Sequence, residues 1–401
     1  MAEPQRDVLI AGAGPAGCVA ALILARAGLS VTLCEAEAAA PADLRASTFH
    51  PPTLDMLAEL DLTEGLLAQG LRAPTYQFRD RATGEAATFD IAAAADLTDF
   101  PFRLQCEQFK LTRLALAALA ETAELRFGAR LSALAQDEDG VEATVETAEG
   151  RETLRSRFVI GAEGASSVAR KAIGAAFEGF TYPEQWVVAS TPEDFSERLP
   201  GLSPVSYTAD PEEWFVLLRV PGLWRVLLPF PEDASAEDAL SDATLERRLQ
   251  GVAPIPRGYE ITHRTIYRVH QRVAETYRRG RIAIAGDAAH LNNPLGGMGM
   301  NGGVHDAVLL ARKLVRVIRD GADADAMLDH YTAQRRAIAI EYVQNHTHGN
   351  RKAIGERDPA KRAAIMAEMK AIAADPERLR AHVRKGAMID AAARSMAVEP
   401  D

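Results

Sequence analysis

Cysteine is scarce in this chain of 401 residues, which contains only Cys18, Cys34 and Cys106. Three thiols at such wide spacing exclude a disulfide framework and a CxxC metal site, so we expect no metal and a reducing, cytoplasmic environment. The first predicted strand follows almost directly after Arg6, which leaves no room for a signal peptide.

Long apolar runs and an excess of positive charge are also absent. No run approaches the roughly 18 apolar residues that a membrane-spanning helix needs, so we expect no membrane span. The formal net charge of −11 argues against nonspecific binding to nucleic acid. With 47% hydrophobic and 25% charged residues, the composition is that of a soluble globular protein that is long enough for two domains.

Several glycines near the N-terminus lie between a predicted strand and a predicted helix. Asp7–Ala11 predicts a buried strand, and the glycine-rich stretch 12–17 then leads into an apolar helix. Leu29–Leu33 predicts a second strand, and Glu35 stands just after it. This order of strand, glycine turn, helix, strand and acid is typical of a site for an adenine dinucleotide, although a purely structural glycine turn is the alternative.

Each part of this unit has a physical role in such a site. Gly12 permits the tight turn, Gly14 lets backbone N–H groups approach a pyrophosphate, and Gly17 lets the helix pack closely on the strand. The helix N-terminus offers unpaired N–H groups and its dipole to the anion. Glu35 is placed to bind the ribose hydroxyls.

Two further stretches join a buried strand to a glycine turn. Phe158–Ile160 is followed by Gly161-Ala162-Glu163-Gly164, and Ser166 or Ser167 then serves as helix cap. By itself this could be only a junction between a strand and a helix. Arg281–Ala285 is a second apolar strand, which ends on Gly286-Asp287 before a glycine-rich loop and a long helix that begins near Asn301.

Between these stretches the composition changes to one rich in tryptophan, proline and strand-forming residues. The pattern predicts an antiparallel sheet, inserted between the two halves of the nucleotide domain, with strands at Val187–Ser190, Val205–Tyr207, Trp214–Val220, Trp224–Pro229 and Tyr259–Val269. The last segments, after Asp358, are helical and charged, which is typical of a solvated cap.

The three glycine motifs together resemble the single-component flavin-dependent aromatic hydroxylases, the group that includes para-hydroxybenzoate hydroxylase. The resemblance covers the chain to about Arg336, where Tyr331 and Arg335-Arg336 are similar to the closing pattern of the family. It departs at Glu163, where the family usually has Asp, and at Met298, where glutamine is common.

The resemblance implies an α/β fold with a Rossmann-like FAD-binding domain, an inserted antiparallel-sheet substrate domain and a C-terminal helical segment. The expected parts are an FAD-binding first part at residues 1–177 with a small strand insert at 71–105, the substrate domain at 178–272, the returning FAD-binding segment at 273–345 and C-terminal helices at 346–401.

The resemblance also implies which residues hold the cofactor. Asp287 would hold the ribityl chain, and the helix start near Asn301 would face the pyrimidine edge of the flavin. The full expected set is Gly12, Gly14, Pro15, Ala16, Gly17, Glu35, Arg45, Gln108, Glu163, Gly164, Arg170, Gly286, Asp287, Pro294, Gly297, Gly299, Met300 and Asn301.

The activity implied by the resemblance is hydroxylation of an electron-rich aromatic or heteroaromatic small molecule, with FAD, O2 and NADH or NADPH, through a flavin C4a-hydroperoxide. The cofactor supplies this chemistry, and the protein supplies position, electrostatics and exclusion of water. Candidates for activating the substrate are Tyr207, Arg219, His263 and the carbonyl of Pro294.

Two histidines near the flavin motifs are weaker candidates. We expect His290 to be a packing or capping residue, and His50 lies in the loop after Arg45.

Three other classes of function compete with the hydroxylase interpretation. A flavin halogenase would carry an early catalytic lysine and a Trp-x-Trp-x-Ile-Pro motif, whereas the first lysine here is Lys110 and Trp224 stands alone in its motif. A flavin-dependent reductase of an unsaturated, isoprenoid-like substrate and an FAD-stabilised binding protein stay open. A phenol, a hydroxybenzoate, a hydroxypyridine or a polycyclic precursor would each fit the motifs, and a homodimer is common among similar enzymes.

Overall fold

The computed structural model describes residues 6–40, 44 and 46–398, whose strands form three sheets. The first sheet has a parallel centre in which β18, β11, β1, β2 and β8 lie side by side. Antiparallel strands join it at β18, which pairs with β17, and at β11, which pairs with β10 and through it with β9. The strands are β1 (Arg6–Ala11), β2 (Val31–Cys34), β8 (Glu124–Arg126), β9 (Arg130–Gln136), β10 (Val141–Thr147), β11 (Gly150–Gly161), β17 (Arg278–Arg279) and β18 (Ile282–Ile284).

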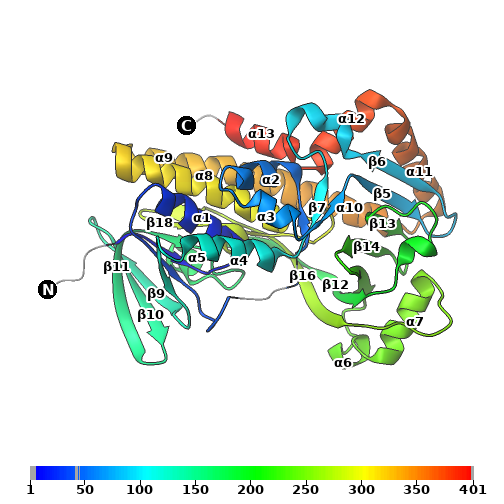
Figure 1. Ribbon diagram of the computed structural model, residues 1–401, viewed down its shortest axis with the longest axis horizontal. Helices are drawn as coiled ribbons and strands as arrows, with labels where there is room; N and C mark the ends of the chain where they lie inside the picture. The colour runs from blue at the N-terminus through cyan, green and yellow to red at the C-terminus, as the bar shows by residue number, and fades with distance from the viewer. Residues whose placement is uncertain (1–5, 41–43, 45, 399–401) are drawn as a thin grey trace.

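Helices cover this sheet, and most residues of α1, which follows β1, are buried. Pro15 begins α1, which suits a position where the backbone N–H would have no helical partner. The helix packs against α4 and α8 (Figure 1). The helices of this half are α1 (Pro15–Arg26), α2 (Pro51–Ala58), α3 (Thr63–Leu67), α4 (Gln108–Leu119), α5 (Val168–Ala172), α8 (Gly299–Asp320) and α9 (Ala324–Ile338).

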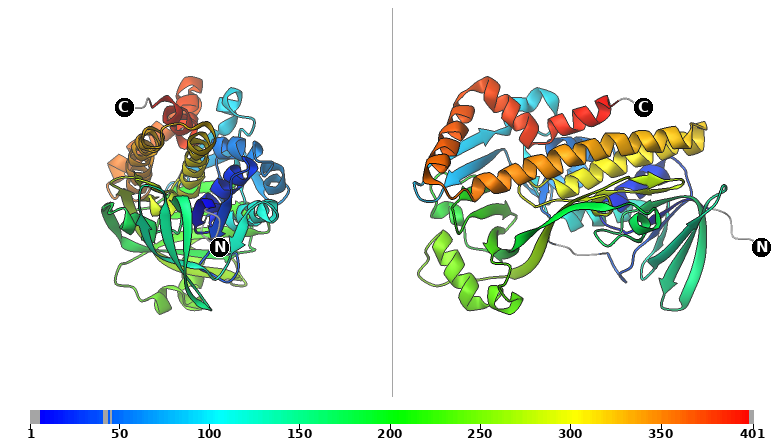
Figure 2. Two further views of the ribbon diagram at one scale, coloured as in Figure 1. Left: turned by 90° about the vertical axis from the view of Figure 1, so that its left-hand side faces the viewer. Right: turned by 180° about the vertical axis from the view of Figure 1, so that it is seen from behind.

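The second sheet is antiparallel except where β13 pairs with β5. Its long strands β12 and β16 run between the two halves of the molecule, as the right-hand view of Figure 2 shows. Short helices α6 (Ala236–Ala239) and α7 (Asp242–Val252) pack on it. Its strands in spatial order are β19 (His290–Leu291), β16 (His263–Ala274), β12 (Phe177–Thr191), β15 (Leu223–Phe230), β14 (Phe215–Val220), β13 (Val205–Ala209), β5 (Thr75–Asp80) and β6 (Ala86–Asp90).

The segment 71–105, where the sequence predicted a small strand insert, contains short strands that join two different sheets. Its hairpin β5–β6 extends the second sheet, because β5 pairs with β13. Its other strands, β4 (Leu71–Ala73) and β7 (Arg103–Gln105), form a separate small sheet with β3 (Thr48–Phe49). The alanine-rich stretch forms a 3-10 helix, η1 (Ile91–Leu97). The domain boundaries themselves stay a prediction.

The C-terminal helices form a layer over one side of the second sheet and over α9. They are the π-helical segment η4 (Ala339–His346), α10 (Thr347–Ile354), α11 (Pro359–Ala374), α12 (Pro376–Gly386) and α13 (Ile389–Ala397). Figure 1 shows α11 and α12 beside β5 and β6, and Val383 and Ile389 pack there in one cluster with Tyr76 and Phe89. The charged face predicted for these helices therefore has a buried opposite face.

Candidate active site

The topology brings the three glycine motifs to one edge of the first sheet. Ala11, Gly161 and Ile284 lie side by side at the ends of β1, β11 and β18. Because these strands are parallel, the turns that follow them leave the sheet at the same edge, which is where open α/β sheets bind their ligands. Segments far apart in the sequence therefore meet around one space.

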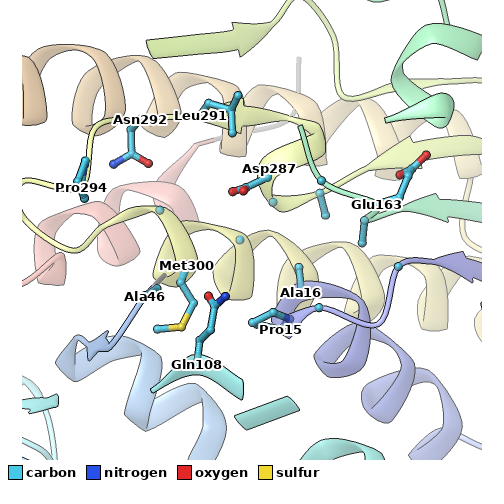
Figure 3. Close-up of a pocket in the computed structure, with 18 of the residues that line it drawn as sticks. Pro15, Ala16, Ala46, Gln108, Glu163, Asp287, Leu291, Asn292, Pro294 and Met300 are labelled. Atoms are coloured by element: carbon cyan, nitrogen blue, oxygen red, sulfur yellow. The ribbon is translucent and has the colours of Figure 1, made fainter. Parts of the chain in front are cut away.

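That space is a cavity of about 490 Å³, shown in part in Figure 3. Gln108 and Met300 reach into it beside Pro15 in this view. The residues predicted for the cofactor that line it are Gly12, Gly14, Pro15, Ala16, Glu35, Gln108, Glu163, Gly164, Gly286, Asp287, Pro294, Gly297, Gly299 and Met300. Gly17, Arg170 and Asn301 do not line it, and Arg45 lies outside the described residues.

Each of the three glycines of the first motif is required for a different structural reason. Gly12 has φ +99°, and a Cβ on it would lie 2.4 Å from the carbonyl oxygen of Ala162. A Cβ on Gly17 would lie 1.9 Å from the carbonyl oxygen of Gly12. Nothing lies within 4 Å of the Cβ position of Gly14, which faces the cavity. Gly12 and Gly17 are thus required by the fold, and Gly14 keeps space for a ligand.

Two helix N-termini open onto the cavity without a side-chain cap. Gly14 precedes α1 and Met298 precedes α8, and neither helix has an acidic residue in its first turn. Both ends therefore offer uncapped backbone N–H groups and positive dipole ends to an anion. The pyrophosphate of FAD and a reduced flavin ring are anions of this kind, so these helix ends fit FAD.

The two acids predicted at the cofactor site are held by backbone N–H groups. Glu35 accepts a hydrogen bond from Ala13 N at 2.8 Å and another from Glu37 N at 3.0 Å. Glu163 accepts one from Ala169 N at 2.7 Å, and burial raises the pKa of its carboxyl group. The longer glutamate thus caps the start of α5 while it also lines the cavity.

Arg170 ties two of the motifs together instead of lining the cavity. Its guanidinium donates to the carbonyl oxygens of Ala165 at 2.7 Å and Ala288 at 3.0 Å. It also lies 3.9 Å from the ring centroid of Phe177. In this structure Arg170 therefore supports the loop that carries Asp287.

A buried ionic network supports the same loop from behind. Asp306, in the middle of α8, accepts hydrogen bonds from Gly286 N at 3.0 Å and His290 Nε2 at 2.9 Å. Arg335 Nε donates to its other oxygen at 2.6 Å, and the neighbouring positive charges hold the pKa of Asp306 well below its usual range against the effect of burial. His290 is thus a structural residue, as the sequence indicated.

Asn301 connects the start of α8 to the strand β3. Its Oδ1 accepts from His50 N at 2.9 Å, and its Nδ2 donates to the carbonyl oxygens of Thr48 at 2.8 Å and Gly297 at 2.6 Å. His50 Nε2 donates to Gly296 O at 2.7 Å. Both side chains therefore hold the glycine loop in place and do not face the cavity.

One wall of the cavity is the face of the second sheet. Val188, Leu227, Val216 and Tyr207 lie in one row across β12, β15, β14 and β13, since each is the direct register partner of the next. Leu218, Arg225 and Tyr267 add to this wall, and Pro294 and Leu295 also line the cavity. The wall is mostly apolar with a few polar groups, as expected for a small-molecule site.

The four candidates for activating the substrate separate into two pairs. Tyr207 and Pro294 line the cavity, and Arg219 and His263 do not. Arg219 follows the cavity-lining Leu218 on β14, so it points to the opposite face, where it pairs with Asp194 at 3.1 Å. His263 begins β16, on the same face as Tyr267 but four residues before it along the strand, and it does not line the cavity.

Sequence reasoning missed several residues of the site. Tyr267 and Arg225 lie in predicted strands, and the alternation of those strands could have assigned them to the cavity face. Asp306 is an acid in an otherwise apolar stretch of α8, which is a signal for a buried ionic partner. Asn292 also lines the cavity, and no pattern in the sequence indicated it.

The described residues contain no group of three or more His, Cys, Asp or Glu side chains placed to hold a metal ion. No helix in the described part of the chain is both long and apolar enough to cross a membrane.

Comparison with known proteins identifies the family of the chain. The family described as "FAD binding domain" matches residues 5–346. Para-nitrophenol 4-monooxygenase of Pseudomonas sp. (strain WBC-3) is 35% identical over 369 residues, which are 90% of each chain. 6-Hydroxy-3-succinoylpyridine 3-monooxygenase of Pseudomonas putida (strain DSM 28022 / S16) is 31% identical, over 90% of this chain and 91% of that protein.

The fold agrees as well. The crystal structure of p-nitrophenol 4-monooxygenase from Pseudomonas putida DLL-E4 superposes with a TM-score of 0.89 at 33% identity, over 94% of this chain and 96% of that one. These similarities do not favour a reductase or a halogenase. The chain therefore belongs to the single-component FAD-dependent aromatic hydroxylases, monooxygenases that use NAD(P)H and O2 to hydroxylate aromatic compounds.

Proposed function

We propose that this enzyme oxygenates a single-ring phenol or hydroxypyridine at the ring carbon para to the hydroxyl group. In the names of both similar enzymes, the position oxygenated (4 in para-nitrophenol, 3 in 6-hydroxy-3-succinoylpyridine) already bears a substituent and lies para to the hydroxyl. We infer the same regiochemistry here, with loss of that substituent.

The observation that carries the choice of a compact substrate is the size and lining of the cavity. The cavity of about 490 Å³ is also lined by the residues proposed to hold FAD, so the cofactor takes up much of it, and the space left beside the second sheet favours one ring over a polycyclic skeleton. The row of Val188, Leu227, Val216 and Tyr207 provides an apolar surface for the ring and one hydroxyl for its oxygen.

We propose that FAD is held by the residues that line the cavity at the edge of the first sheet. The N-terminus of α1 would receive the pyrophosphate, Glu35 the adenosine ribose and Asp287 the ribityl chain. The bound FAD would supply hydride acceptance from NAD(P)H and activation of O2. The N-terminus of α8 would stabilise negative charge on the reduced ring, and the apolar wall would exclude water.

The nitrophenol isomers test the proposed regiochemistry. The reaction of 4-nitrophenol with O2, NAD(P)H and one proton gives benzoquinone, nitrous acid, water and NAD(P)⁺, and all atoms balance. We expect the purified, FAD-loaded enzyme to release nitrite in step with NAD(P)H oxidation from 4-nitrophenol, and not from 2- or 3-nitrophenol. Nitrite from all three isomers, or from none, would contradict the proposal.

Two further expectations concern the assembly of the chain and its location. We propose a cytoplasmic homodimer, because dimers are common among similar enzymes and the chain has few cysteines. Light scattering of the purified holoenzyme tests the dimer, which a mass near 43.3 kDa would contradict.

A further inference from the structure

Arg103 is a buried arginine directly behind the wall of the cavity. It begins β7, in the small sheet next to the second sheet, and its exposed fraction is 2%. Its Nη1 donates to the hydroxyl of Tyr207 at 3.4 Å. Tyr207 lines the cavity, so this contact links the arginine to the place where substrate would lie.

The other contacts of Arg103 leave its positive charge without an acidic partner. Its Nη2 donates to the carbonyl oxygen of Gly386 at 3.1 Å, and its guanidinium carbon lies 4.2 Å from the ring centroid of Tyr76. Its Nε is buried and has no hydrogen-bond partner among the described residues. Within that part of the chain, none of its nitrogens pairs with a carboxylate.

A second buried arginine shows how this fold compensates such a charge elsewhere. Arg335 is 1% exposed and donates to Asp306 at 2.6 Å, with further bonds to Gly302 O and Ser395 Oγ. Buried charges in proteins are nearly always paired in this way, because an unpaired ion loses its hydration without return. Arg103 has no such partner among the described residues, and unlike Arg170 it donates to the hydroxyl group of a side chain that lines the cavity.

The groups around Arg103 do not neutralise its charge. Burial lowers the pKa of His50, His346 and His382, and the charge of Arg103 lowers each of them further, to about 4 for His346 and His382. These rings are therefore neutral at pH 7. The titratable groups that face this region are Tyr76, Tyr207, His50, His346, His382 and Lys385.

We propose that Arg103 is a positioning residue that acts through Tyr207 to bind the substrate as its phenolate anion. The guanidinium polarises the Tyr207 hydroxyl, which then donates its proton in a hydrogen bond to the phenolate oxygen. An ionised phenol is the more electron-rich ring, so the same contact prepares the substrate for oxygenation. This inference rests on the proposed function, since it assumes that a phenol occupies the cavity.

A purely structural role for Arg103 would give different behaviour. The carbonyl of Gly386 lies at the C-terminal end of α12, where a cation satisfies a backbone acceptor and the helix dipole. If Arg103 serves only as this cap, its removal would lower thermal stability. The relative affinity of the cavity for anionic and neutral ligands would stay unchanged.

Ligand binding to the oxidised holoenzyme tests the proposal without turnover. The probes are 4-nitrophenol, whose phenolate has its own visible absorption band, and nitrobenzene, which lacks the hydroxyl and stays neutral. Titrations across pH give the affinity for each probe and the ionisation state of bound 4-nitrophenol. The variants are R103M, R103K and Y207F, and the control R264M removes an arginine that pairs with Asp242 on the outside of the second sheet.

We expect wild type and R264M to keep 4-nitrophenol ionised about one pH unit below the pH at which the free ligand is half protonated. R103M and Y207F should lose this shift and bind the phenolate about tenfold more weakly, and their affinity for nitrobenzene should change by less than about twofold. R103K should restore part of the shift because it keeps the charge.

Three results test the proposed role of Arg103. An unshifted ligand in wild type, or an unchanged shift in folded R103M and Y207F, would overturn the role of Arg103. A shift that is lost in R103M, in an enzyme that releases no nitrite, would support Arg103 and refute only the proposed reaction.

Discussion

At the scale of single residues, the glycines of the first motif show how one sequence pattern serves two purposes. Gly12 and Gly17 are close to other backbone atoms, so a side chain at either position would collide with the fold. Gly14 has an ordinary φ of −73° and open space beside it. Its lack of a side chain therefore matters for the ligand and not for the chain itself.

Alanine substitutions at Gly14 and Gly17 test the role in ligand binding and the role in the fold separately. We expect G17A to destabilise the protein by at least about 3 kcal/mol, because its Cβ would overlap the Gly12 carbonyl. G14A should leave the Tm of the apoprotein within about 2 °C and raise the Kd for FAD about tenfold, since its methyl group occupies the cavity. Differential scanning calorimetry and flavin fluorescence measure the two effects.

The control for G14A is G349A, a glycine-to-alanine change on the exposed side of α10 where nothing lies within 4 Å of the Cβ position. It should leave FAD affinity unchanged. Equal FAD affinity of G14A and G349A would show that Gly14 does not face the cofactor.

At the scale of secondary-structure elements, the start of α8 is positioned by one amide side chain. Asn301 makes three hydrogen bonds that join the helix, the glycine loop and β3. Since α8 carries an uncapped N-terminus at the cavity, the direction of its dipole depends on these bonds. The resemblance assigned Asn301 to the flavin, whereas the structure gives it a supporting position.

Replacing Asn301 tests whether this support matters for the cofactor. We expect N301A to lose about 3 kcal/mol of stability, about 1 kcal/mol for each hydrogen bond, and to bind FAD about tenfold more weakly. Chemical denaturation of the apoprotein and FAD titration of the same sample measure both. A stability loss with unchanged FAD affinity would show that α8 keeps its position without Asn301.

The sequence predicted these elements well where local chemistry determines them. The strand and glycine turn at Asp7–Gly17, the helix from Gln108 and the apolar strand before Gly286 were all confirmed. The pairing of β5 with β13 was not foreseen, because it joins residues about 130 positions apart and leaves no local pattern. For the same reason nothing in the sequence placed Arg103 behind Tyr207.

At the scale of the whole molecule, neutral buried histidines link stability to pH. Burial lowers the pKa of His305 to about 3 and of His346 and His382 to about 4. Between pH 6.5 and about 4 the unfolded chain binds protons at these histidines and the folded chain does not. Stability therefore falls as pH decreases through this window.

Thermal unfolding at fixed ionic strength measures this dependence. We expect the Tm to fall steadily from pH 7 to pH 5, with each fully buried histidine contributing at most about 1.4 kcal/mol per pH unit. H305Q, which keeps a hydrogen-bonding group near Thr53, should reduce the slope. Carboxylates with a lowered pKa, such as Asp306, lose their contribution only at more acidic pH. A Tm that is constant over this range would contradict the assignment of neutral histidines.

The arrangement of the two sheets explains why one chain can serve as both cofactor holder and substrate pocket. The parallel edge of the first sheet and the face of the second sheet enclose the same cavity, and β12 and β16 connect the two halves (Figures 1 and 2). Monooxygenation in this cavity requires that oxygen from O2 reaches a ring that lies against Tyr207.

Isotope labelling tests that requirement most directly. The enzyme would be supplied with ¹⁸O2, NAD(P)H and 4-nitrophenol, and the quinone would be trapped at once by reduction with ascorbate and analysed by mass spectrometry. We expect one ¹⁸O atom in each hydroquinone and one nitrite for each NAD(P)H consumed. Unlabelled hydroquinone, or ¹⁸O recovered only as peroxide, would contradict the monooxygenase account.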